Sequence, residues 1–263
     1  MNATEKTLQT RTSLRRYADR PISEEERLSI LSAAMAAPTA GNMMLYSIIE
    51  ITDQAVKESL VETCDGQSFI AKAPLVLLFL ADQQRWHDFF VHGGVPKMCD
   101  EHGLTWREPE ESDLMLGCCD ALIAAQNSVI AAESLGIGSC YIGDIMENYE
   151  RHRDIFELPR WTFPIALVCY GHYPDGERPP RRGRLPMEIV VHRDVYRKAD
   201  EKVFDIMEDH RRLWSITKIG APAENGAQKM YLRKNGAPFS FEMSRSVKAA
   251  ISRWLGEEPK DHD

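Results

Sequence analysis

The sequence predicts an α+β fold, because segments with the pattern of strands alternate with helices of unequal length. The run "PLVLLFLAD", residues 74–82, is apolar almost throughout, which is typical of a strand buried on both faces of a sheet. The stretch from Asp113 to Leu135 reads as a long helix that is apolar nearly all round. Such a helix belongs at the centre of a fold or between subunits.

The first part of the chain is expected to contain two helices before its first strand. One ends near Thr10, and the next, "SEEERLSILSAAMAA", has Ser23 as its N-cap, Glu26 in the capping-box position and Pro38 as its stop. The elements expected next are the strand "YSIIEIT", a helix from Asp53 to about Cys64 and a short helix from Gln67 to Lys72.

After the long helix the pattern predicts three strands and one surface helix. These are the strand "CYIG", the helix "ENYERHRDIFEL", the buried strand "FPIALVCYGH" and a last strand "MEIVVHR". Residues 83–112 mix aromatic, histidine, glycine and charged residues, and are interpreted as an excursion that could form a lid. Residues 193–263 are more polar and form a divergent C-terminal extension, with "GAPAENGAQ" as a loop and "SRSVKAAISRWLG" as an amphipathic helix.

The composition and net charge are those of a globular protein and exclude several classes of binding partner. The 263 residues are 43% hydrophobic and 27% charged, as in a soluble globular protein, and the motifs below favour a single domain over residues 1–263. The net charge of −8 argues against general binding of nucleic acid or anionic membranes. The plainly apolar run Ala73–Ala81 is too short to span a membrane, and the six cysteines show no C-x-x-C spacing. A cytoplasmic protein with free thiols is expected.

Two arginine-containing motifs could bind an anion. In "RTSLRRY", Arg11, Ser13 and Arg15 occupy alternating positions, so in an extended segment their side chains point the same way. Arginine binds phosphate through two parallel hydrogen bonds. A second cluster, "RPPRRGRLP", contains Arg178, Arg181, Arg182 and Arg184. An acidic chain with arginines at two remote points is consistent with one shared anion site, although solvated loops would give the same composition.

A glycine-containing turn follows the long helix in "AAESLGIGSCYIGDI", residues 131–145. Glycine lets another group approach the backbone, so this turn either reverses the chain or holds a ligand against main-chain N–H groups. It is not a dinucleotide fingerprint, because it follows a helix and enters a strand. The histidines and the cysteine of residues 83–112 lack a metal-binding spacing, so no metal site is expected.

Taken in order, seven motifs resemble those of the nitroreductase family of FMN-dependent flavoproteins, and most closely its NADPH-dependent nitroreductase and flavin reductase branch. The resemblance covers about residues 8–192. The motifs are "RTSLRRY", "APTAGN", "GQSFIAKAPLVLLFLAD", "DALIAAQNSVIAAESLGIGSCYIGDI", "FELP", "CYGHYPD" and "RRGRLP". The resemblance implies a three-layer α+β fold, with a mainly antiparallel central sheet flanked by helices, and an intertwined homodimer with FMN at the interface.

The resemblance also implies which residues contact the cofactor. Arg11, Ser13, Arg182 and Arg184 would hold the FMN phosphate, with Thr12 beside them, and Arg15 would lie near N1 and O2 of the ring. Main-chain N–H groups of Tyr141, Ile142, Gly143 and Asp144 would face its N5 and O4 edge, while Asn42 and Gln67 would contact the flavin. Thr12, Met43, Met44 and Asp144 depart from the residues usual in the family.

The implied activity is transfer of electrons from NADPH or NADH, by a ping-pong mechanism, to nitroaromatics, quinones or flavins. The flavin carries the redox step, so no protein group is assigned as a catalytic acid. Two alternatives stay open: an enzyme of the same fold with a dedicated substrate, acting by dehalogenation or flavin fragmentation, and a non-catalytic FMN-binding redox protein.

Overall fold

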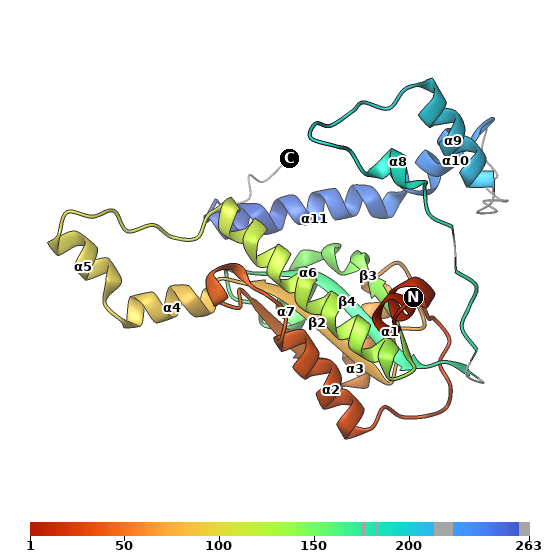
Figure 1. The fold of residues 1–263 in the computed structure, drawn as a ribbon. Helices are drawn as coiled ribbons and strands as arrows, with labels where there is room; N and C mark the ends of the chain where they lie inside the picture. The colour runs from red at the N-terminus through yellow and green to blue at the C-terminus, as the bar shows by residue number, and fades with distance from the viewer. Residues whose placement is uncertain (175–176, 182, 213–222, 258–263) are drawn as a thin grey trace. The chain divides into compact units, whose positions relative to one another are not determined.

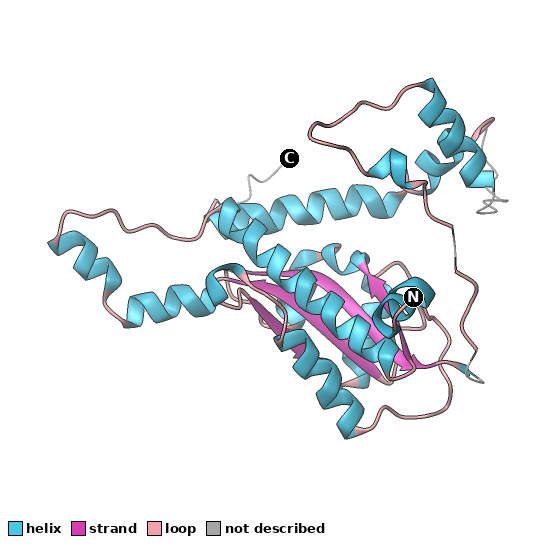
Figure 2. Ribbon diagram, viewed as in Figure 1, coloured by secondary structure: helices cyan, strands magenta, loops and turns pink. Residues whose placement is uncertain are grey.

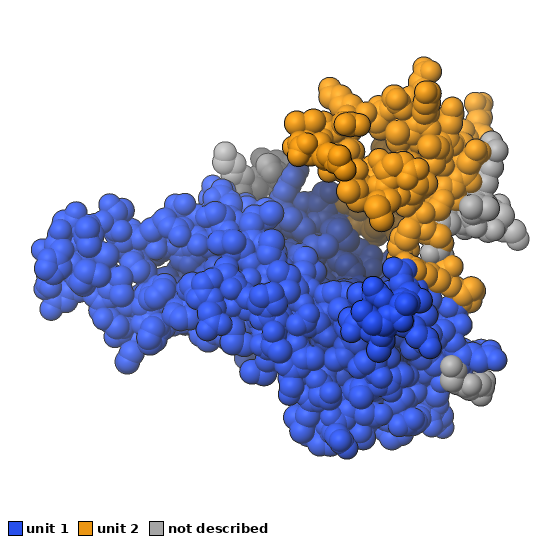
Figure 3. Space-filling model, in the orientation of Figure 1, with its two compact units in different colours: residues 1–179, 242–263 blue, residues 180–241 orange. Residues whose placement is uncertain are grey.

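The structure is a computed structural model that describes residues 1–174, 177–181, 183–212 and 223–257. Contacts divide the chain into two compact units, coloured separately in Figure 3. Unit 1 contains residues 1–179 and 242–263, and unit 2 contains residues 180–241. The sheet and the long apolar helix belong to unit 1 (Figure 1).

Unit 1 is built on a four-stranded sheet of order β1-β2-β4-β3. Its strands are β1 (Tyr46–Glu50), β2 (Leu75–Asp82), β3 (Ile137–Ile142) and β4 (Thr162–His172). All three neighbouring pairs are antiparallel, and β2 lies between β1 and β4. Every residue of β2 is buried, as its unbroken apolar sequence predicts.

Two layers of helix cover the two faces of the sheet (Figure 2). Alternate residues of β2 point to opposite faces, so Leu77 packs with α2 (Glu24–Met35) and α6 (Glu111–Ser134). Its neighbour Leu78 packs on the other side with α3 (Gln54–Thr63) and the 3-10 turn η2 (Gly143–Met146). The predicted three-layer α+β fold with an antiparallel sheet is therefore confirmed.

The helix α6 passes a length and composition test for membrane-spanning helices. It nevertheless packs against α2 and all four strands, and its buried positions include Ala124, Ala125 and Val129. Its apolar character therefore reflects its place in the core. The start of α2 is also as predicted, because Ser23 and Glu26 form the reciprocal capping box.

The C-terminal helix α11 (Pro238–Leu255) closes a third apolar cluster of unit 1 with its last turns. Trp254 is 1% exposed and donates its indole N–H to the carbonyl oxygen of Glu110 at 3.1 Å. Trp161 donates its own indole N–H to the carbonyl oxygen of Trp254 at 3.1 Å. These bonds attach the last turn of α11 to the segment before α6 and to the segment before β4.

The excursion at residues 83–112 contains two helices, α4 (Gln84–His92) and α5 (Val95–Glu101), which extend away from the sheet in Figure 1. Unit 1 also contains α1 (Ala3–Thr10), α7 (Tyr149–Ile155) and the 3-10 turn η1 (Ala40–Asn42). Unit 2 contains α8 (Met187–Val190), α9 (Glu201–Arg212), α10 (Gly226–Arg233) and the start of α11.

Several local predictions were wrong. The segment "MEIVVHR" begins with the short helix α8 instead of a strand, because no strand pairs with it there among the described residues. Residues 68–72 form successive turns closed by i to i+3 hydrogen bonds instead of a helix. Part of the predicted loop "GAPAENGAQ" is the first turn of α10, capped by Asn225, and its residues 220–222 lie outside the described part. The helix α7 buries Tyr149 and His152, so it is not a surface helix throughout.

Candidate functional site

The segment that carries Arg11, Ser13 and Arg15 lies along the outer edge of β3. Ser13 forms an isolated parallel bridge with Ser139, and the N–H of Leu14 donates to the carbonyl oxygen of Ser139 at 2.9 Å. The segment can approach this closely because Gly138 and Gly171 face each other across β3 and β4. A Cβ atom on Gly138 would lie 2.7 Å from the Leu14 side chain, so glycine is required by the contact.

Several predicted site residues act on the thiol of Cys140, which lies on β3. Burial raises the pKa of Cys140, while the positive charges of Arg15 and Arg11 and a hydrogen bond with Ser13 oppose that increase. The carboxylate of Asp144, at the far end of β3, raises it further. The basic segment and the turn that carries Asp144 therefore both act on the same residue of β3.

Arg11 is incompletely paired within the described part of the chain. Its Nη1 is buried and has no hydrogen-bond partner there, and the hydroxyl of Thr12 is in the same state. The carboxyl of Glu133 at the end of α6 lies close enough for Arg11 to lower its pKa against the larger effect of burial, which raises it. A buried guanidinium N–H without an acceptor is costly, and an anion bound beside it would remove that cost.

Gln67 and Phe69 contact two further residues of the predicted site, Asp144 and Arg15. Gln67 donates through Nε2 to Asp144 Oδ2 at 2.8 Å and to the carbonyl oxygen of Cys64 at 3.1 Å. Arg15 lies over the ring of Phe69, 5.9 Å from its centroid. Gln67, Arg15 and Asp144 are thus brought together, although they are remote in the sequence.

The turn after β3 leaves space at its backbone. Gly143 is exposed, and a Cβ atom there would meet only Cε of Met146, at 3.9 Å. Ile142 is buried in the core, whereas Tyr141 is half-buried and lies near Arg11. A ligand could therefore reach the main chain of this turn with little steric hindrance.

Asn42 lies in a different environment from this cluster. Its turn has left-handed backbone angles at Gly41, Asn42 and Met44, with φ of 56°, 57° and 53°. The buried carboxylate of Asp120 on α6 accepts the backbone N–H groups of Ala40 and Leu45 at 3.0 and 3.2 Å. These contacts connect the turn to α6.

The helix α4 holds the same turn from the other side. Trp86 donates its indole N–H to the carbonyl oxygen of Met43 at 2.7 Å, and Arg85 donates to those of Met44 and Tyr46. Among the described residues, the side-chain hydrogen bonds that reach the Asn42 turn from other elements come from α4 and α6, and Met44 packs against the apolar core.

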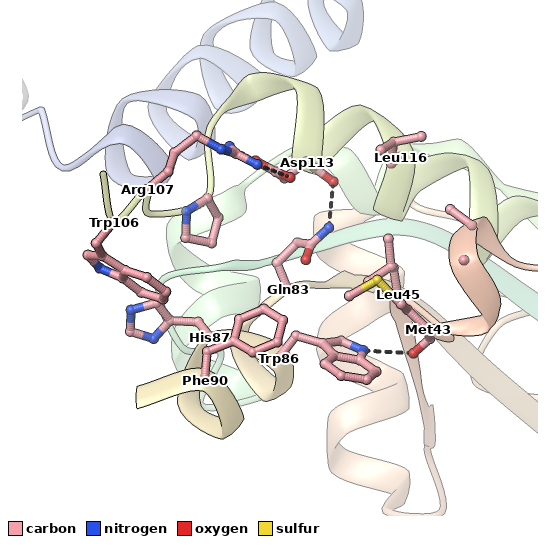
Figure 4. A pocket seen from close by; sticks show the side chains of 13 residues that line it. Met43, Leu45, Gln83, Trp86, His87, Phe90, Trp106, Arg107, Asp113 and Leu116 are labelled. Atoms are coloured by element: carbon pink, nitrogen blue, oxygen red, sulfur yellow. Dashed lines mark hydrogen bonds and ion pairs between the residues drawn. The ribbon is translucent and has the colours of Figure 1, made fainter. Parts of the chain in front are cut away.

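A cavity of about 310 Å³ is lined by residues of the turn that carries Asn42, of the excursion and of α6 (Figure 4). Trp86, His87, Phe90 and Trp106 give it an aromatic wall, and the ion pair between Arg107 and Asp113 closes one side. Its remaining lining residues are Ala40, Gly41, Met43, Leu45, Gln83, Pro109 and Leu116.

The second basic cluster divides between the two units. Arg178 pairs with Glu133, with 3.3 Å between Nη2 and Oε2, and lies over the ring of Tyr173. Arg184 is exposed and belongs to unit 2, and Arg182 lies outside the described residues. The part of the anion site assigned to Arg182 and Arg184 stays a prediction.

Sequence reasoning missed four buried polar residues near these turns: Asp120, Glu133, Glu147 and His152. His152 fixes the turn η2, because its Nδ1 donates to the carbonyl oxygen of Ile145 at 2.9 Å and its Nε2 lies 2.7 Å from Thr63 Oγ1. Burial lowers the pKa of His152 to about 4. One of the four could have been found from the sequence: Glu147 follows Asp144 by three residues, and Asp144 departs from the residue usual in the family.

The layered fold, with an arginine-containing segment along the edge of β3 and an open glycine turn after that strand, defines the class as an α+β protein with a three-layer arrangement. The family model described as "Nitroreductase family" matches residues 8–172. The chain belongs to the nitroreductase family.

Named relatives extend over most of the chain. It is 31% identical over 234 residues to the oxygen-insensitive NADPH nitroreductase of Salmonella typhimurium, covering 88% of this chain and 91% of that protein. It is 34% identical over 208 residues to the FMN reductase [NAD(P)H] of Bacillus subtilis, covering 76% and 77%.

Solved structures show the same fold. NfrA2 of B. megaterium matches with a TM-score of 0.77 and 25% identity over 97% of this chain and 98% of that chain. NADPH:FMN oxidoreductase of Vibrio harveyi, solved with NAD+, matches with a TM-score of 0.76 and 24% identity, over 95% and 98%.

Proposed function

We propose that this chain is an FMN-dependent NAD(P)H oxidoreductase that passes electrons to nitroaromatics, quinones or flavins. Relatives named as an NADPH nitroreductase and as an FMN reductase support this activity. The observation in the structure that carries the proposal is the buried Nη1 of Arg11, which has no acceptor among the described residues; Arg11 acts electrostatically on Cys140, as does Asp144 of the open turn. A phosphate and a planar ring would satisfy the two features together.

The residues of this cluster have separate tasks in the proposal. Arg11, Thr12 and Ser13, with Arg182 and Arg184, would hold the phosphate. Bound FMN would supply the redox chemistry, accepting a hydride from NAD(P)H and releasing the electrons to an acceptor.

The remaining assigned residues orient the ring. Arg15 supplies a positive charge beside it, and the main-chain N–H groups of Tyr141 to Asp144 provide donors to its polar edge. The ring of Phe69 beneath Arg15 and the amide of Gln67 support this side of the site. These groups act by position and charge.

A second copy of the chain completes this arrangement. Met115, Leu116, Cys119, Leu122 and Ile123 are exposed and recur at helical spacing, so they form one apolar stripe on α6. The Asn42 turn is attached to the same helix. A homodimer formed through this stripe would bury it, and would allow the Asn42 turn of one protomer to serve the flavin of the other.

We place the enzyme in the cytoplasm, which agrees with six cysteines that form no disulfide. Residues 83–112 serve in the proposal as a lid, supported by the contacts of α4 with the Asn42 turn. The single-domain organisation over residues 1–263 stays a proposal as well.

The absorption spectrum of the purified protein tests the proposed function. A flavin band that bleaches on anaerobic addition of NADPH or NADH is expected. Arg11→Ala should lose FMN, whereas the exposed neighbour Arg16→Ala should retain it. A colourless protein after incubation with FMN would contradict the site, and a band that neither nucleotide bleaches would support the non-catalytic alternative.

A further inference from the structure

Two carboxyl side chains lie together at the turn η2. The N–H of Glu147 donates to the carbonyl oxygen of Asp144 at 3.0 Å, so the chain folds back within three residues. Asp144 is half-buried, and its Oδ2 is held by Gln67. Glu147 is 5% exposed, lies close to the Asp144 carboxyl, and its Oε1 has no hydrogen-bond partner within the described part of the chain.

The surroundings of Glu147 favour its neutral form. Burial, followed by the neighbouring carboxyl of Asp144, raises its pKa to about 8. Asp65, in the turn after α3, and Glu242, on α11, add to the increase. Glu147 therefore carries a proton at pH 7.

Other groups near the pair leave this proton in place. The buried thiol of Cys64 lies beside both carboxyls, and burial raises its pKa to about 12. On α7, His152 is neutral at pH 7 because burial lowers its pKa. Arg245 neutralises Glu242, with 2.8 Å between their charged atoms, and is therefore engaged elsewhere. Glu147 thus keeps its proton in a site that faces further carboxylates.

Asp144 connects this buried carboxyl to the proposed cofactor site. It shares the environment of Cys140 with Arg11, Arg15 and Ser13, and it is partly accessible where Glu147 is not. A proton leaving Glu147 towards the site therefore meets the Asp144 carboxylate first.

Resting on the proposed function, we propose that Glu147 stores a proton for the acceptor half-reaction and that Asp144 delivers it to the reduced acceptor. A quinone that has taken a hydride needs one further proton to become a hydroquinone. The proton of Glu147 first passes to the Asp144 carboxylate. The new O–H bond of Asp144 then breaks as an O–H bond forms on the acceptor, and the electron pair stays on the carboxylate. Glu147 recovers its own proton from water.

The first test uses the protein without flavin. The side-chain carboxyl carbon of Glu147, observed by 13C NMR in the apoprotein, should titrate near pH 8 in the parent protein. The signal should be absent in Glu147→Gln, and its midpoint should fall in Asp144→Asn, because a neighbouring negative charge is removed. A Glu147 midpoint near 4.5 in the parent would overturn the proposal.

The second test measures reoxidation of the NADPH-reduced enzyme by duroquinone across pH. In the parent protein the rate should fall as pH rises through about 8, since the donor loses its proton. Glu147→Gln should slow reoxidation about a hundredfold at pH 7 and remove the pH dependence. The exposed carboxylate of α7 provides the matched control, Asp154→Asn, which should behave as the parent.

Asp144→Asn keeps the test decisive if Glu147→Gln does not fold. Because Asp144 delivers the proton, this variant should be reoxidised about a hundredfold more slowly at pH 7 and without pH dependence, while the NMR midpoint of Glu147 falls. Reoxidation of the parent protein that is independent of pH, or parent-like reoxidation of Asp144→Asn while its NMR midpoint falls, would overturn the proposal. A parent protein that binds no FMN, or is not reduced by NAD(P)H, would instead contradict the proposed function.

Discussion

Gly138→Ala should displace the segment that carries Arg11, Ser13 and Arg15 without changing any charge. The new Cβ would lie 2.7 Å from Cδ2 of Leu14 and 2.9 Å from its Cβ. Leu14 is 2% exposed, and its Cβ is fixed to the backbone, so rotation of its side chain alone does not relieve the contact. The segment must therefore move off the edge of β3.

The magnitude follows from two opposing effects. Overpacking a filled site lowers the free energy of unfolding by about 1–3 kcal/mol. Replacing glycine by alanine in a strand raises it by about 0.5–1 kcal/mol, because alanine reduces the conformational entropy of the unfolded chain. A net loss of about 1–2 kcal/mol is expected. For a unit of this size that corresponds to a melting temperature lower by about 2–8 °C.

Gly143→Ala is the matched control, because its Cβ meets only Met146 Cε at an ordinary contact distance. The stability of its apoprotein should stay within about 0.5 kcal/mol of the parent. Its affinity for FMN should nevertheless fall, since the methyl group occupies space in front of the main-chain N–H groups.

Thermal unfolding of the apoproteins and fluorescence titration with FMN measure these effects. Gly138→Ala should lose both stability and FMN affinity, whereas Gly143→Ala should lose FMN affinity alone. Parent-like values of both quantities in Gly138→Ala would refute the inference that the glycine seats the basic segment.

Three further predictions follow. Asp120→Asn should lower the free energy of unfolding by about 1–3 kcal/mol in urea, since both carboxylate oxygens accept N–H groups of the turn that carries Asn42 and the amide replaces one of them with an NH2 group. Leu122→Asp should shift the protein towards monomer in light scattering, because it places a charge in the apolar stripe of α6. Finally, stability should fall from pH 6.5 to 8, because folded Glu147, with its raised pKa, binds more protons than the unfolded chain, while the opposite effect of His152 is confined to lower pH.

Each of these predictions has a control. Asp88→Asn changes an exposed carboxylate on α4 and should retain parent stability. Leu104→Asp changes an exposed leucine outside α6 and should leave the assembly intact. The slope between pH 6.5 and 8 should disappear in Glu147→Gln; an unchanged slope would show that another group is responsible.

The predicted elements of the core were confirmed where local signals were strong. The capping box at Ser23, the apolar run of β2 and the long apolar stretch of α6 each depend on residues close together in the sequence. Prediction was wrong for "MEIVVHR", whose β-branched residues favour a strand, because no other described strand pairs with this segment.

The basic segment, the glycine turn and Gln67 were predicted from sequence as site candidates because their residue types and motif order are themselves informative. The sequence could not show that Arg11, Arg15 and Asp144 converge on Cys140, or that Gln67 donates to Asp144. Those facts depend on which strands pair, and pairing brings together residues that lie far apart along the chain.

By itself, the sequence determined the fold class, the family resemblance and the chemistry available to the site. Only the tertiary structure decided which polar groups are buried without a partner in the described part of the chain, such as Arg11 Nη1 and Glu147 Oε1. The reason is physical: the charge state and the hydrogen-bonding of a side chain depend on desolvation and on its neighbours in space, and neither is encoded at a single position.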